Sequence, residues 1–216
     1  MMKTLFLLPL LLFSFVMTGC AVEQKQPYDY TELEKAKPKS ILLVMPTNNS
    51  VEAKADVSVL AQASIPLAEL GYYVYPVALV DDVFKQNGAH TGNDIQALSL
   101  PKIHQIFGAD AIMYLDIEEY GSSYRIVSSD TIVTLSAKLV DLRTGTTLWQ
   151  GRTSERTSDS PNNSLIGVLV AQIINSLTDK GYDVAGLATH QLFRFGENGG
   201  LLLGPRATGV AARKGL

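Results

Sequence analysis

The stretch 130-DTIVTLSAKLVDLRTGTTLWQGRTSE-155 decides the fold, because it contains two strands and the turn that joins them. Apolar residues occupy one face of the first strand: Val133, Leu135, Ala137 and Leu139. Polar residues occupy the other face: Thr134, Ser136 and Lys138. This alternation predicts an antiparallel strand with one face in water. Asp141 and Gly145 suit a hairpin turn, and Thr146–Glu155 forms the return strand.

The segments before this hairpin predict two strands with a helix between them. "SILLVMP" (Ser40–Pro46) is a continuous apolar run, typical of a strand buried on both faces. Val57–Leu70 has helical spacing; we expect Pro66 to kink or restart it, with Ser64 as a new cap, and Gly71 to end it. "YYVYPVAL" is β-branched and aromatic, which predicts a second strand over residues 72–79.

The remaining segments are mostly helical. We predict short helices over residues 80–87 and 100–108, the second capped by Ser99. A third strand follows over residues 109–120 and should break at Gly121-Ser122-Ser123. After the hairpin, we predict a long helix that begins at Asn162 or Asn163 and a final helix over residues 182–193.

The order of these elements defines a fold class. Strands and helices follow one another as β-α-β-α-β-β-β-α, with the last helical region divided in two. Helices after the first two strands indicate parallel crossovers, and the later hairpins indicate antiparallel pairing. We therefore expect an α/β (α+β) fold with a single mixed β-sheet and helices mainly on one face.

The N-terminus has the layout of a secretory signal. Lys3 is followed by an apolar run over residues 4–16, too short for a spanning helix, and then by "MTGC" (Met17–Cys20). "MTGC" resembles the bacterial lipobox, in which the cysteine is acylated after cleavage just before it. Cys20 is the only cysteine, so acylation would also remove a free thiol from a secreted protein. Ala21 replaces the Asp associated with inner-membrane retention, so the resemblance favours the outer membrane, on its periplasmic face or at the cell surface.

Composition divides the chain into four parts. We expect a signal peptide over residues 1–19 and a lipidated flexible tether over 20–39, which is polar and poor in aliphatic residues. Residues 40–196 form a globular domain, and residues 197–216 a Gly-rich tail with little fixed structure. Without Lys3, 17 of the 18 Lys and Arg residues remain against 21 Asp and Glu, a net charge of −4, which argues against nucleic acid as a partner.

Several segments resemble known envelope proteins. "AKLVDLRTGTTLWQG" (Ala137–Gly151) is similar to periplasmic lipoprotein domains of the curli-secretion-channel type, to penicillin-binding-protein activator lipoproteins and to the small domain of the Tol-system propeller protein. "GYYVYPV" (Gly71–Val77), "FGADAIMYLDI" (Phe107–Ile117) and "LLLGPR" (Leu201–Arg206) resemble a family of bacterial lipoproteins of unknown function that includes a genome-derived neisserial antigen. The resemblance implies a lipid-anchored domain and supplies no catalytic residues.

No motif of the sequence assembles a catalytic, metal or cofactor site. "SLPK" (Ser99–Lys102) has the S-x-x-K spacing of serine acyltransferases but lacks the partner motifs. The three histidines lack metal-ligand spacing, and Gly196–Gly200 lacks the Lys-Ser/Thr of a phosphate loop. Asp116 and Glu118 share a strand face, where we expect a solvated strand end.

Two functions of different class remain. The first is a non-enzymatic, outer-membrane-anchored accessory that binds an envelope protein in transport or assembly, with self-association through a sheet edge as a variant. Lys138 and Arg143 are the candidate partner-binding residues, and Trp149 is either a core residue or a recognition residue. The second is a hydrolase or ligand-binding lipoprotein acting on cell-wall material, which would need a deep pocket with converging polar groups.

Overall fold

The computed structural model describes residues 27–124, 129–158, 180–196 and 199–207. Its strands are β1 (Ser40–Leu43), β2 (Thr47–Asn48), β3 (Tyr73–Val74), β4 (Ala111–Tyr124), β5 (Ser129–Asp141) and β6 (Thr147–Ser158). Its helices are α2 (Thr31–Ala36), α3 (Ala55–Glu69), α4 (Val77–Gln86), α5 (Gly92–Gln96), α6 (Leu100–Phe107) and α8 (Lys180–Leu192). The long helix predicted from Asn162 or Asn163 falls outside the described residues.

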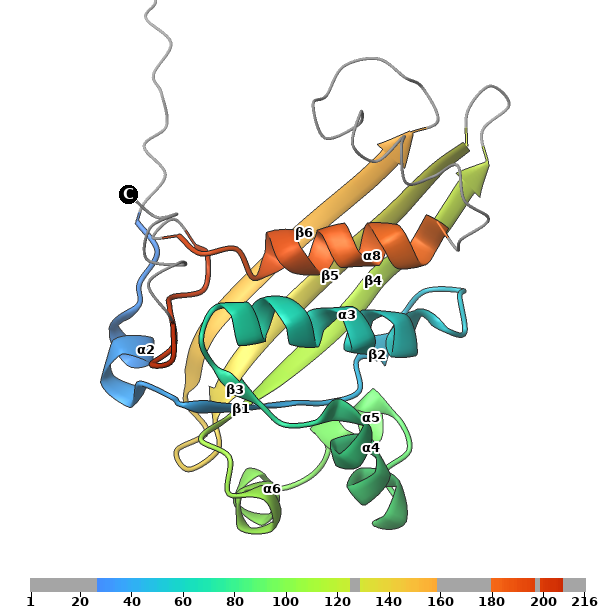
Figure 1. Cartoon of the computed structure of the whole chain (residues 1–216). Coiled ribbons are helices and arrows are strands. Elements are labelled where there is room, and N and C mark those ends of the chain that lie inside the picture. The colour runs from blue at the N-terminus through green and yellow to red at the C-terminus, as the bar shows by residue number, and fades with distance from the viewer. Residues whose placement is uncertain (1–26, 125–128, 159–179, 197–198, 208–216) are drawn as a thin grey trace, which may run out of the picture.

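The strands form one mixed sheet in the order β3-β1-β4-β5-β6, with β2 paired to β4 beside this path. β1 is parallel to both of its neighbours, whereas β4, β5 and β6 are antiparallel to one another. Helices α3 and α8 lie across one face of the long strands, and α4, α5 and α6 gather below the parallel end (Figure 1). The predicted α/β class, single mixed sheet and mainly one-sided helices are confirmed.

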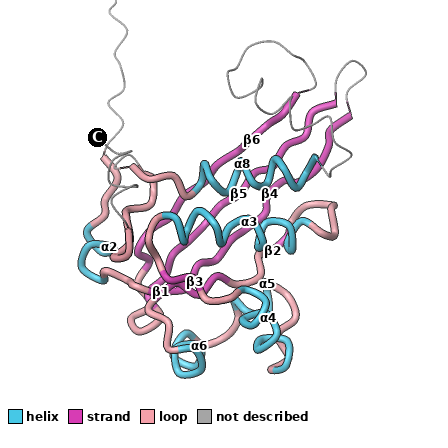
Figure 2. Tube along the Cα trace, in the orientation of Figure 1, coloured by secondary structure: helices cyan, strands magenta, loops and turns pink. Residues whose placement is uncertain are grey.

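The core follows from the alternation along β5. Val133, Leu135 and Leu139 are fully buried on the side that α8 covers, while Lys138 on the opposite side is exposed. Near β1 the sheet is buried on both faces, as the apolar runs Ile41–Leu43 and Ala111–Leu115 predict. The magenta strands in Figure 2 show how much longer the antiparallel half is than the parallel half.

Three sequence-based boundaries are wrong. Strand β3 contains only Tyr73–Val74, because Val77 already belongs to α4, whose buried Val80 and Phe84 have helical spacing. Helix α3 continues through Pro66 without a restart, and the Ser64 hydroxyl donates to the Ala61 carbonyl (3.2 Å) instead of capping. Strand β4 also continues through Gly121, which adopts a φ of 127° after a bulge between Ile117 and Glu119.

Other short elements differ from the prediction in detail. The sequence predicts no helix or strand at the positions of β2 and α5, and α5 begins with a capping box between Thr91 and Asp94. Gly71 ends α3 with a φ of 89°, as predicted. Ser99 occupies the predicted cap position of α6, but its side chain makes no capping hydrogen bond.

The segment before β1 packs on the domain over residues 27–39, contrary to the flexible tether predicted there. Helix α2 buries Leu33, which is 3% exposed, and the rings of Tyr28 and Tyr30 lie 4.7 Å apart. The Tyr30 hydroxyl lies 2.9 Å from the Gly196 carbonyl oxygen and 2.6 Å from that of Gly200. These aromatic and aliphatic side chains bury enough surface to order a segment that is otherwise polar.

Residues 199–207 also pack on the domain, although they belong to the tail predicted to have little fixed structure. Leu201 is fully buried. The backbone N–H groups of Gly204 and Arg206 donate to the carbonyls of Leu70 (2.8 Å) and Gly71 (3.0 Å). A side chain at Gly71 would collide with the backbone at Ala207, only 2.1 Å away, so this close approach requires glycine.

Candidate functional site

The two edges of the described sheet differ in length and in protection. β3 at one edge pairs only two residues with β1, and the Arg206 guanidinium stacks on its Tyr73 ring, 5.0 Å from the centroid. β6 at the other edge is a 12-residue strand that pairs with β5 on one side. Long edge strands offer unpaired backbone groups to other chains. β6 is therefore the edge to consider for binding.

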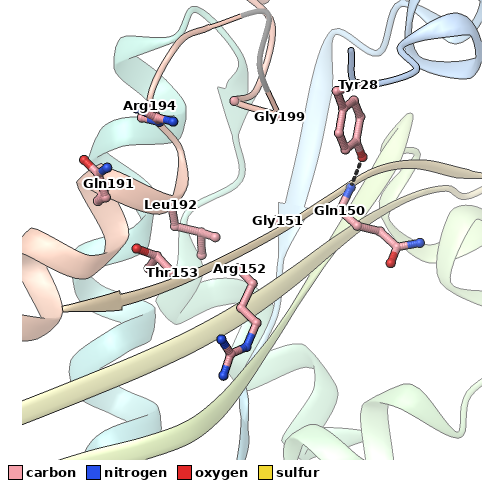
Figure 3. A pocket seen from close by; sticks show the side chains of 10 residues that line it. Tyr28, Gln150, Gly151, Arg152, Thr153, Gln191, Leu192, Arg194 and Gly199 are labelled. Atoms are coloured by element: carbon pink, nitrogen blue, oxygen red, sulfur yellow. Dashed lines mark hydrogen bonds between the residues drawn. The ribbon is translucent and has the colours of Figure 1, made fainter. Parts of the chain in front are cut away.

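Tyr28 shows which backbone groups of β6 point outward. The Gln150 N–H donates to the Tyr28 hydroxyl (2.7 Å), which lies outside the sheet (Figure 3). In an antiparallel pair, N–H and C=O groups of alternate residues face the same side. The backbone groups of Arg152, Ser154 and Arg156 consequently also point away from β5.

A groove lies along this edge and encloses about 610 Å³. We call it the β6 groove; its lining is Tyr28, Gln150, Gly151, Arg152, Thr153, Gln191, Leu192, Arg194, Gly199 and Gly200. β6 supplies its floor, and the end of α8, the Gly199–Gly200 loop and the segment before α2 supply its walls (Figure 3). The lining is mainly polar, but among the residues that the structure describes it includes no Asp, Glu, His, Ser or Cys. Such a lining suits binding better than acid–base or nucleophilic chemistry.

Trp149 packs in the core beneath β6, the strand that forms the floor of the groove. The side chain is 1% exposed, so the core alternative is correct and the exposed recognition alternative is wrong. Its indole N–H donates to the Gly199 carbonyl (3.2 Å), and its ring lies 6.0 Å from that of Phe193. A Cβ atom at Gly151 would lie 2.4 Å from the indole, so glycine lets the ring cover the strand. Trp149 thus joins β6, the end of α8 and the Gly199 loop.

The two predicted partner-binding residues lie in different surroundings. Lys138 is exposed on the face of β5 opposite α8, in a shallow depression that also contains Gln150 and Arg152. Arg143, in the turn, forms an ion pair with Asp110 (3.3 Å). Asp110 also accepts hydrogen bonds from the backbone N–H groups of Lys39 (2.9 Å) and Ser40 (3.1 Å).

Its ion pair with Asp110 gives Arg143 a structural role in addition to its position on the surface. Partial burial acts to raise the pKa of Asp110, but the hydrogen bonds from Lys39 and Ser40, together with the charge of Arg143, hold that pKa below its ordinary value. Replacing Arg143 with an acidic residue would place a second carboxylate next to that of Asp110. The repulsion would disturb the start of β1, whose backbone Asp110 binds. Substitution of Lys138 is the cleaner test of partner binding.

The acidic residues of β4 are paired with neighbours. Glu118 forms an ion pair with Arg152 (2.7 Å) across the polar face, and hydrogen bonds from Arg152 lower the pKa of Glu118. Asp116 accepts hydrogen bonds from the Thr47 hydroxyl and the Gln96 amide. Among the described residues, no group of three or more His, Cys, Asp or Glu side chains is placed to bind a metal ion.

Sequence reasoning missed most residues of the β6 groove. Its lining comes from three segments that are far apart in the chain, represented by Tyr28, Gly151 and Gln191, and no spacing rule connects them. Cys20, the predicted lipid attachment site, lies outside the described residues. In the part of the chain that the structure describes, no helix is both long and apolar enough to cross a bilayer.

The fold and the groove define a small mixed-sheet domain with a long edge strand beside a polar groove. The chain belongs to the family described as "Putative lipoprotein GNA1162-like", whose profile matches residues 28–206. A curated relative, "Putative lipoprotein NMB1124/NMB1162" of Neisseria meningitidis serogroup B, is 45% identical over an alignment of 195 residues, with coverage of 88% of this chain and 91% of the relative. The lipoprotein resemblance drawn from the sequence is confirmed.

One solved structure of the family supports this assignment. The crystal structure of lipoprotein GNA1162 from Neisseria meningitidis is similar, with 45% sequence identity and a TM-score of 0.55, over 64% of this chain and all of that chain. A dodecameric PelC from Paraburkholderia phytofirmans has 10% identity and a TM-score of 0.45 over 78% of this chain and 92% of its own, a level that says nothing about function.

Proposed function

We propose that this lipoprotein is acylated at Cys20, is held on the outer membrane, and binds a partner protein in envelope transport or assembly. Binding takes place by addition of an extended segment of the partner to β6. The observation that supports it is the 12-residue edge strand β6, whose outward backbone groups border a groove of about 610 Å³. The described lining consists of groups suited to hydrogen bonding with a bound chain, which supports binding without catalysis.

The polar face of the sheet, next to the β6 groove, adds to the proposed binding surface. Lys138, Gln150 and Arg152 line the depression next to the β6 groove on the face opposite α8. Side chains of a strand added to β6 would continue onto this face, because side chains of neighbouring strands meet in cross-strand pairs. Lys138 thus retains its predicted role as a partner-binding residue.

We expect Ser154→Pro to reduce copurification of the partner about tenfold while the domain stays folded. Proline lacks the outward N–H, and its ring blocks a strand that approaches from that side. Because the Ser154 N–H points away from β5, the sheet itself loses no hydrogen bond. Copurification from detergent-solubilised envelopes and the melting temperature of the purified domain measure the two effects.

Ser154→Ala is the matched control for this substitution. Both variants lose the hydroxyl that lies 2.9 Å from the Thr134 hydroxyl, but alanine keeps the backbone N–H. Alanine should therefore copurify the partner at the level of the unsubstituted chain. Equal copurification by the proline and alanine variants, with both folded, would rule out strand addition at this edge.

A further inference from the structure

The packed segment before β1 shortens the chain that connects the domain to its lipid. The sequence alone predicts a tether over residues 20–39, but Tyr28, Tyr30 and Leu33 hold residues from 27 onward against the domain. Only residues 21–26 then separate Cys20 from the packed segment that begins at Pro27. Fully extended, a chain of that length spans at most about 25 Å, and as a flexible coil about 15 Å.

This length is short compared with the domain. A globular domain of about 160 residues has a radius of gyration of about 15 Å and hence a diameter of about 40 Å. A connection shorter than the diameter cannot reach around the molecule, so the side of the domain where the chain leaves must face the bilayer. That side is the one at Tyr28, whose hydroxyl accepts from β6 and whose ring lines the β6 groove.

We infer that the β6 groove opens at the membrane surface and that its occupant is an extended segment of a protein embedded in the same membrane. The inference rests on the proposed acylation of Cys20 and names the class of partner for the proposed binding edge. A protein in the bulk periplasm would have to enter between the domain and the bilayer. A membrane-embedded protein presents its surface loops and strand ends at that depth.

The chemistry of β6 specifies the segment further. Arg152 and Ser154 each direct one N–H and one C=O away from β5, which an extended backbone matches along a two-residue repeat. A second copy fits poorly, because antiparallel self-pairing centred on Ser154 would place Arg152 opposite Arg156 of the other copy.

Energy transfer to the bilayer tests the orientation. In the acylated chain Cys20 is blocked, so a cysteine introduced at Gln191 in the groove or at Leu79 on α4 is the only free thiol for a donor dye. Leu79 is 64% exposed, and α4 lies on the other side of the molecule from α2 in Figure 1. In phospholipid vesicles that carry an acceptor-labelled lipid, we expect at least twofold higher transfer from position 191 than from position 79. Equal or reversed transfer would overturn the orientation.

Two control chains separate this inference from the proposed anchor. A flexible insert of about 40 Gly and Ser residues between Gln26 and Pro27 should remove the difference between the two positions, because the coil then spans nearly 40 Å. Cys20→Ser should leave the protein unbound to vesicles. A serine variant that stays bound would overturn the proposed anchor, whereas a bound, acylated chain without a difference in transfer would overturn only the orientation.

Crosslinking in intact cells tests the class of partner. A photoreactive phenylalanine analogue at Gln191 should form adducts with a protein that resists extraction by alkaline carbonate, as membrane-embedded proteins do. Ser154→Pro in the same chain should reduce that adduct about tenfold. Adducts with extractable periplasmic protein, with a second copy of this chain, or with lipid alone would each overturn the assignment of the partner.

Discussion

Trp149→Ala is expected to lower the free energy of unfolding by about 3–5 kcal/mol, the usual cost of truncating a buried aromatic side chain. Trp149 is 1% exposed, packs against Phe193 and covers Gly151. Its indole N–H also donates to the Gly199 carbonyl, so truncation removes a hydrogen bond as well as apolar contacts. The loss should loosen β6, the end of α8 and the wall of the β6 groove together.

Urea unfolding followed by far-UV circular dichroism measures this effect. Trp149 is the only tryptophan, so its fluorescence cannot report on the alanine variant. Trp149→Phe is the matched control: it keeps an aromatic ring but lacks the indole N–H, and we expect a loss of about 1–2 kcal/mol. If the alanine variant lost less than about 1 kcal/mol, Trp149 would not join these three elements.

The hairpin could be predicted because its sequence pattern and its surroundings agree. Alternation along β5 places Val133, Leu135 and Leu139 under α8, and Asp141 and Gly145 form the turn. Gly145 adopts a φ of 73°, and the Asp141 carboxylate accepts from the backbone N–H groups of Arg143 (2.8 Å) and Thr144 (2.9 Å). Local turn chemistry and the burial of one face therefore specify the same structure.

The wrong boundaries arise where tertiary contacts outweigh local preference. Residues 72–79 are rich in β-branched and aromatic side chains, yet Val80 and Phe84 are buried at helical spacing, so Val77 begins α4 instead of extending β3. Gly121 was expected to end β4, but pairing with Ile132 on β5 continues across it. Helix α5 had a usable sequence pattern, a Thr91-x-x-Asp94 capping box, which the sequence analysis did not use.

The candidate site was less predictable than the fold. The exposure of Lys138 could be predicted because it lies on a strand with clear alternation, and its role in partner binding stays a prediction. The β6 groove depends on Tyr28, the end of α8 and the Gly199–Gly200 loop meeting at one strand, and such long-range contacts leave no periodic trace in a sequence. The edge position of β6 likewise depends on the order of strands, which pattern alone does not determine.

The second large effect concerns residues 27–37. A chain that begins at Pro38 should be about 3–6 kcal/mol less stable than a chain that begins at Pro27. Burial of Leu33, which is 3% exposed, contributes about 2 kcal/mol, and each lost hydrogen bond of Tyr28 and Tyr30 contributes about 1 kcal/mol. Both chains keep Lys39 and Ser40, whose N–H groups bind Asp110, so the start of β1 is unaffected.

Denaturant midpoints of the two chains test this expectation. Tyr30→Phe separates the contribution of the Tyr30 hydrogen bonds from that of apolar burial. The phenylalanine variant keeps the ring and loses the hydroxyl contacts with Gly196, Gly199 and Gly200, so we expect a loss of about 1–3 kcal/mol. Equal stability of the chains that begin at Pro27 and Pro38 would mean that residues 27–37 act as a tether after all. The connection to Cys20 would then include residues 21–37. Its fully extended length of about 60 Å would exceed the domain diameter of about 40 Å, and the β6 groove would no longer have to face the membrane.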